Sequence, residues 1–114
     1  MTDADPAPDA PPAPDTTPTV RLDATIRGRV QGVGFRYYVL RRAMGLGLRG
    51  WVANERDGSV RCVAEGPLEA VDTLLEILEH GPAGAVVERV DVIRGAASGS
   101  FASFEIRSGG HSGD

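Results

Sequence analysis

"GRVQGVGFRYY", residues 28–38, joins two segments with different periodicities. Before it, residues 20–30 alternate apolar and polar side chains, which is typical of a strand with one buried face. After it, apolar residues recur at helical spacing until Gly45 and Gly47, which favour a helix end. The stretch therefore predicts a strand-to-helix corner built on three glycines, with Arg36 in the first turn of the helix.

The rest of the chain predicts a hairpin, a second helix and two further strands. Residues 48–66 hold two strand-like runs around Asp57 and Gly58, a pair typical of short hairpin loops. Residues 67–80 carry an apolar stripe opposite acidic side chains, which predicts an amphipathic helix ending before Gly81. The stripe comprises Leu68, Val71, Leu74, Leu75 and Leu78. The remaining strand-like runs are residues 85–93 and residues 101–107.

The predicted order is β-α-β-β-α-β with a short strand at the end. This is the order of the split βαβ, ferredoxin-like α+β fold, in which two helices cover one face of an antiparallel sheet. We assign this domain to residues 20–107. Residues 1–19 hold six of the eight prolines and no leucine, isoleucine, valine or aromatic residue, so we expect a disordered tail. We expect residues 108–114 to be a mobile tail.

The composition argues against nucleic-acid binding, disulfides, metal sites and membrane association. Residues 20–114 carry 12 arginines and 12 acids, so the net charge of −4 belongs to the first tail, and a general nucleic-acid binder is disfavoured. Cys62, His80 and His111 have no partners at metal-ligand spacing, so we expect neither a disulfide nor a metal site. The absence of a signal peptide or a long apolar run favours a cytoplasmic protein without membrane association.

The glycine corner has two interpretations from its residues alone. Such a corner leaves backbone N–H groups without intrahelical partners, and the helix dipole adds positive potential there. Glycines allow these groups to converge on an anion, and the guanidinium of Arg36 suits phosphate or carboxylate. Alternatively, the glycines serve only a tight turn and Arg36 is solvated. The stretch lacks the Gly-Lys-Ser/Thr ending of a P-loop, and its glycine spacing differs from that of the dinucleotide-binding fingerprint.

"GRVQGVGFR", followed by "LGLRGWV", an asparagine and "DGSV", closely resembles the acylphosphatase family. The matching stretch spans residues 28–60, and "FEIR" resembles the last strand of that family. The resemblance implies a small monomeric enzyme that hydrolyses acyl phosphates without a metal or other cofactor. Inorganic phosphate would be its product and competitor.

The resemblance also assigns roles to residues. Arg36 would pair with the phosphate, and Asn54 would hold the attacking water by its side-chain amide. The preceding loop would present backbone N–H groups to the phosphate oxygens, and no covalent intermediate is implied. That loop comprises Gln31, Gly32, Val33, Gly34 and Phe35. One departure is Ala53, because the family often has a basic residue at this position.

Two other functions remain open. The same corner occurs in a module that handles carbamoyl phosphate during hydrogenase maturation, but there zinc-finger-like cysteines follow in a very long chain, and this chain has one cysteine. The fold also serves non-catalytic ligand-sensing or RNA-reading domains. RNA readers expose aromatics on their central strands, whereas we expect Trp51 to pack within its strand. Glu55 and Asp57 could form an acid/base pair near Asn54, although turn chemistry explains them better.

Overall fold

The fold comes from a computed structural model that describes residues 18–108. The two predicted tails therefore lie outside the described residues, apart from Pro18, Thr19 and Ser108 at their inner ends. The elements are β1 (Thr19–Arg29), α1 (Phe35–Gly45), β2 (Arg49–Asn54), β3 (Val60–Pro67), α2 (Leu68–His80), β4 (Val86–Ala96) and β5 (Phe104–Arg107).

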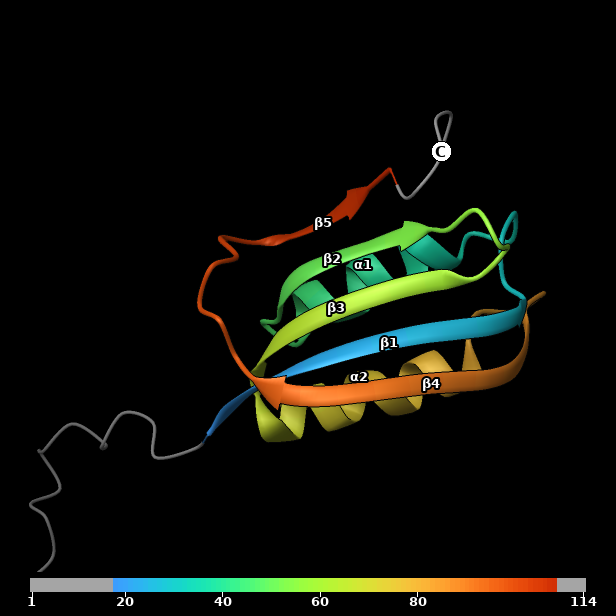
Figure 1. Ribbon diagram of the computed structural model, residues 1–114. Helices are drawn as coiled ribbons and strands as arrows, with labels where there is room; N and C mark the ends of the chain where they lie inside the picture. Colours follow the sequence, from blue (N-terminus) through green and yellow to red (C-terminus); the bar gives the residue numbers. More distant parts are fainter. Residues whose placement is uncertain (1–17, 109–114) are drawn as a thin grey trace, which may run out of the picture.

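Both helices lie against one face of a single sheet whose strand order is β4-β1-β3-β2-β5 (Figure 1). This arrangement confirms the predicted ferredoxin-like α+β fold. The first four strands pair antiparallel, whereas β5 pairs parallel with β2, so the complete sheet is mixed. After β4 the chain crosses one end of the sheet and turns back, which gives β5 the direction of β2 (Figure 1).

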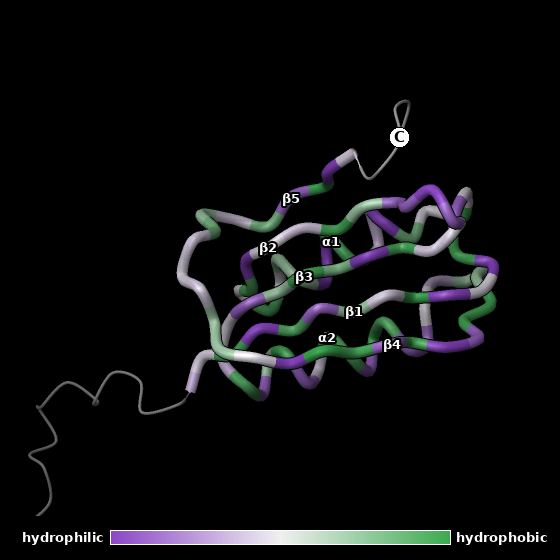
Figure 2. Tube along the Cα trace, viewed as in Figure 1, coloured by the Kyte–Doolittle hydropathy of each residue, from purple (hydrophilic) through white to green (hydrophobic). Residues whose placement is uncertain are grey.

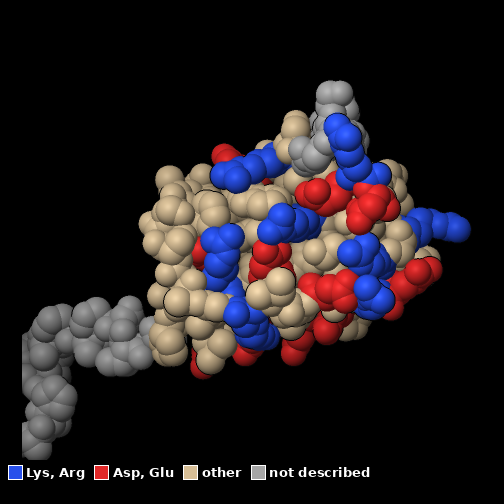
Figure 3. Space-filling view, in the orientation of Figure 1, with Lys and Arg blue, Asp and Glu red and all other residues tan. Residues whose placement is uncertain are grey.

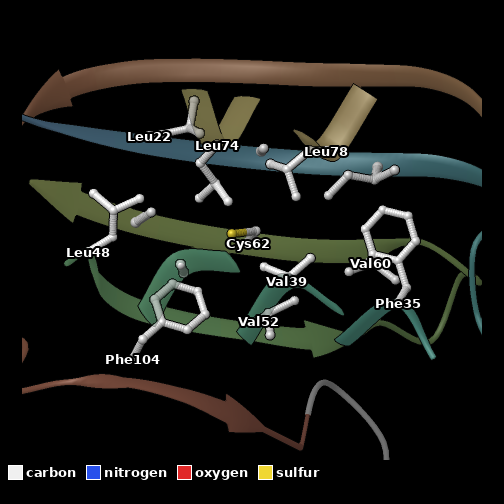
Figure 4. Close-up of a cluster of buried hydrophobic side chains, with 14 of the residues drawn as sticks. Leu22, Phe35, Val39, Leu48, Val52, Val60, Cys62, Leu74, Leu78 and Phe104 are labelled. Carbon is white, nitrogen blue, oxygen red and sulfur yellow. The ribbon is translucent and has the colours of Figure 1, made fainter. Parts of the chain in front are cut away.

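The core lies between the sheet and the helices. Hydrophobic and hydrophilic residues alternate along β1 (Figure 2), and the register with β3 places Leu22 opposite Ala64 and Ala24 opposite Cys62. These side chains meet Val39 and the leucines of α2 in one buried cluster (Figure 4). Cys62 is thus a fully buried core residue. Burial raises the pKa of its thiol, which makes it inert as a nucleophile.

The two helices bury one stripe each. In α1 the buried residues are Phe35, Val39 and Ala43, and in α2 they are Val71, Leu74 and Leu78. Leu75 is half-buried. The predicted stripe of α2 extended too far toward its N-terminus, because Leu68 remains 37% exposed. Leu68 is the first helical residue, where its backbone N–H donates to the carbonyl of Pro18.

Gly28 lies at the register shift between β1 and β4, immediately before the corner. Its φ is +131°, and a Cβ at this position would clash with the backbone carbonyl oxygen of Val86. We expect Gly28→Ala to lower the free energy of unfolding by about 2–4 kcal/mol, because the backbone is strained and neighbouring backbone must move. Urea denaturation measures the change.

Gly45 provides a matched control for that substitution. It lies in α1, where an added Cβ meets no atom within 4 Å. Gly45→Ala should therefore be neutral or stabilising, because alanine favours the helix and restricts the unfolded chain. Equal unfolding free energies for the two variants would contradict the proposed constraint at Gly28.

Candidate active site

The corner between β1 and α1 is formed by two glycines in left-handed backbone conformations. Gly32 and Gly34 adopt φ of 77° and 80°, in the left-handed region that favours glycine. An added Cβ would meet no atom within 4 Å at either position. Glycine is therefore required here by conformation and not by packing. The loop of residues 31–34 consequently leaves its backbone accessible from outside.

The N-terminus of α1 carries no negative group of its own among the residues that the structure describes. Gly34 is the N-cap residue, no side chain caps the helix, and the first turn contains no acid. The first backbone hydrogen bond runs from the N–H of Tyr38 to the carbonyl of Gly34, at 3.0 Å. Earlier N–H groups lack intrahelical partners, so the positive end of the helix dipole faces the loop. Arg36 adds a half-buried guanidinium in this turn.

Asn54 is the last residue of β2, immediately before the turn that the side chain of Gln31 contacts. It is 8% exposed and pairs with Val60 of β3, which also pairs with Ile26 of β1. Its side-chain oxygen Oδ1 is buried and has no hydrogen-bond partner within residues 18–108. A buried unpaired polar atom costs about 1–3 kcal/mol, so such atoms are rare unless they serve a function.

The side chain of Gln31 joins the loop to the turn that follows Asn54. Its Nε2 donates to the carbonyl oxygens of Glu55 and Ser59, at 2.8 and 2.9 Å. The loop after β1 and the end of β2 are therefore held together. The sequence placed Gln31 in the site only through its backbone, so this contact was missed. The available signal was that Gln31 is the one glutamine in the chain.

The carboxylate of Asp57 is hydrogen-bonded within the turn between β2 and β3. It accepts hydrogen bonds from the hydroxyl of Ser59 at 2.6 Å, from the backbone N–H of the same residue at 3.0 Å, and from Arg27 at 3.2 Å. These bonds, those from Ser59 first, lower the pKa of Asp57 to about 2. The carboxylate stays ionised at neutral pH and cannot donate a proton there. This favours the turn interpretation over an acid/base pair.

Two hollows of the surface are lined by residues outside this corner. One of about 270 Å³ is at the opposite end of the sheet, between Arg49, Glu65 and Phe101. Another of about 500 Å³ lies over the open face of the sheet, near Asp23 and Arg61, and it also borders Glu55 and Ser59 of the turn that Gln31 contacts. Neither is lined by residues 31–36 or Asn54. The exposed glycines of the corner and the N-terminus of α1 suit a small anion better than a large apolar ligand.

The open face of the sheet carries both signs of charge side by side (Figure 3). Arg61 pairs with Asp23 at 2.6 Å. Trp51 is half-buried, and the guanidinium carbons of Arg61 and Arg107 lie 5.4 and 5.3 Å from its ring centroid. As expected, Trp51 packs against neighbours on the strands, here under two arginines, and it is not presented as a bare stacking platform.

Within residues 18–108, no group of three or more His, Cys, Asp or Glu side chains gathers at metal-binding distance. No described helix is both long and apolar enough to cross a membrane.

Comparison with known proteins identifies one family across the domain. The acylphosphatase family model matches residues 22–106. The acylphosphatase of Salinibacter ruber is 52% identical over 87 residues, covering 76% of this chain and 92% of that protein. The acylphosphatase of Thermus thermophilus is 48% identical over 79 residues, which cover 69% of this chain and 90% of that protein.

Solved structures agree with the sequence matches. The crystal structure of acylphosphatase from Bacillus subtilis has a TM-score of 0.75 and 35% identity, covering 77% of this chain and 98% of that one. HypF from T. kodakarensis has a TM-score of 0.69 and 31% identity, covering 78% of this chain but 12% of HypF. The domain thus matches nearly all of the first protein and one segment of the second.

Proposed function

The chain belongs to the acylphosphatase family and hydrolyses acyl phosphates, and we propose that it does so by direct attack of water on phosphorus, without a metal or a covalent intermediate. The new bond forms between the water oxygen and phosphorus, and the bond from phosphorus to the carboxyl oxygen breaks. The carboxylate departs with the bonding electrons. One proton of the attacking water stays on its oxygen, and the other passes to another oxygen of the phosphate product. A carboxylate is a good leaving group, so no strong general acid is required.

The phosphate binds at the corner between β1 and α1 in this proposal. Backbone N–H groups of residues 31–35 contact its oxygens, and the guanidinium of Arg36 pairs with the same group. Two observations support this assignment: the left-handed glycines Gly32 and Gly34, and the N-terminus of α1 without an acid or a cap. Phosphoryl transfer depends mainly on positioning and on stabilising charge on the equatorial oxygens, which these groups supply.

Asn54 orients the attacking water in this proposal. The observation that carries it is the buried Oδ1, which has no partner among the described residues and belongs to the residue before Glu55, where Gln31 is bound. An amide oxygen accepts a hydrogen bond from water and so leaves a lone pair on the water oxygen available for attack. A weak acceptor suffices here because the leaving group is activated. We further propose that the protein acts as a cytoplasmic monomer on small acyl phosphates.

The cofactor-free mechanism predicts resistance to chelation. Because Arg36 and backbone amides supply the positive charge at the phosphate, hydrolysis of acetyl phosphate by the purified protein should be unchanged in excess EDTA. Inorganic phosphate should inhibit competitively, since it shares the bound group. Both are measured by steady-state release of phosphate or acetate.

Three outcomes separate this proposal from its rivals. Loss of activity in EDTA that a divalent ion restores would refute the metal-free mechanism. Phosphate binding without turnover of acetyl phosphate would indicate a non-catalytic binding module. A strong preference for carbamoyl phosphate over acetyl phosphate would favour a role like that of the carbamoyl phosphate module.

A further inference from the structure

We propose that the side chain of Gln31 is a positioning residue, which fixes the phosphate loop relative to Asn54. The inference rests on the proposed function, because it assumes that the loop holds phosphate and that Asn54 holds water. It assigns a role to the side-chain amide that is separate from the backbone N–H of the same residue. The two hydrogen bonds from Nε2 to the carbonyls of Glu55 and Ser59 carry it.

The turn does not require Gln31 for its own hydrogen bonds. The carbonyl of Glu55 also accepts from the N–H of Gly58, at 3.1 Å, and the carbonyl of Ser59 accepts from the N–H of Glu55, at 2.8 Å. Each carbonyl oxygen has two lone pairs and keeps one partner when Gln31 is removed. The glutamine bonds are therefore an added link between two segments that are 24 and 28 residues apart.

The orientation of this amide is fixed by its surroundings. Both carbonyls are acceptors, so only the NH₂ group of Gln31 can face them, and a flipped amide would place oxygen against oxygen. One NH₂ group with two donors thus anchors the start of the loop to both ends of the turn. Asn54 immediately precedes this turn.

This anchor matters for the reaction because two groups must be aligned. Phosphate is held by one segment and water by another, and attack requires the water oxygen in line with the leaving group. Misplacement by about 1 Å can cost about 10²-fold in rate. The internal geometry of the loop depends instead on its glycines and on α1. Losing the anchor should therefore impair alignment more than phosphate binding.

The first test is Gln31→Met, which keeps the length of the side chain and removes both donors. We expect kcat for acetyl phosphate to fall about 10- to 100-fold, while the Ki of inorganic phosphate changes by less than about threefold. Because the carbonyls keep other donors, the melting temperature should fall by no more than about 8 °C.

Ser98→Ala is the matched control, since it removes a partly buried side-chain hydrogen bond to Glu65 in a different part of the fold. Its kcat should equal that of the unmodified protein.

The second test is the double variant with Asn54→Ala. If Gln31 acts through the alignment of water, Gln31→Met should lower kcat by less than about threefold once Asn54 is already alanine. Full additivity of the two losses would overturn the inference, as would a loss of phosphate affinity equal to the loss in kcat/KM. If Arg36→Ala and Asn54→Ala inactivate the enzyme but Gln31→Met does not, the inference fails and the proposed function stands. If Asn54→Ala is fully active, both fail.

Discussion

Replacing Arg36 with alanine is expected to lower kcat/KM for acetyl phosphate by about 10²–10³-fold, with KM raised and kcat lowered together. The guanidinium is proposed to contact the phosphate in the ground state and again as charge redistributes toward the transition state. Its removal should therefore weaken inhibition by inorganic phosphate as well. Steady-state kinetics and the Ki of phosphate measure both effects.

Two variants test whether this effect belongs to the site. Arg36→Lys keeps the charge but loses the planar fork that binds two oxygens, so it should restore little activity. Arg41→Ala removes an exposed arginine from the same helix and should change kcat/KM by less than about threefold, because an exposed charge is strongly screened. A loss for Arg36→Ala no greater than that for Arg41→Ala would show that net charge, and not a phosphate contact, explains the effect.

Periodicity was sufficient to predict the elements of this fold. Leu22, Ala24 and Ile26 alternate inward in β1, and Phe35 and Val39 are buried at helical spacing in α1. These patterns are local, because burial of one face of a strand or helix depends on residues within a few positions. The resemblance supplied the identity of the candidate residues, whose catalytic roles stay predictions.

The features that the sequence did not reveal depend on distant contacts. Glu65 has the opposite parity in β3 to the core residues Cys62 and Ala64, which predicts an outward side chain, yet it is 5% exposed. It accepts hydrogen bonds from Ser98, Gly99 and Arg21. Burial by itself would raise the pKa of Glu65, but these bonds together outweigh it and hold the pKa below the ordinary value. The partners lie 33, 34 and 44 residues away, beyond any local pattern.

Contacts between distant residues also explain why the sequence did not predict the anchor of Gln31 or the direction of β5. The bonds of Gln31 span 24 and 28 residues, so the sequence placed this residue in the loop without its anchor. The direction of β5 depends on how residues 97–103 cross the end of the sheet. A strand of four residues has no pattern that distinguishes parallel from antiparallel pairing.

Asn54→Ala is expected to lower kcat by about 10²–10³-fold while changing the Ki of inorganic phosphate by less than about threefold. The amide is proposed to hold water and not phosphate, so the loop and Arg36 should still bind the anion. The substitution also removes the buried Oδ1 that has no partner. The melting temperature should therefore stay equal or rise by several degrees, about 4–8 °C for each kcal/mol gained.

The combination of these readouts is more decisive than activity alone. An inactive but equally or more stable variant with normal phosphate affinity fits a residue that the fold retains for chemistry at some cost in stability. Asn54→Asp sharpens the comparison, because it keeps an acceptor oxygen but adds a negative charge near the phosphate. It should weaken phosphate inhibition where Asn54→Ala does not. If Asn54→Ala lost phosphate affinity as severely as Arg36→Ala, Asn54 would be a phosphate ligand, and another group would have to orient the water.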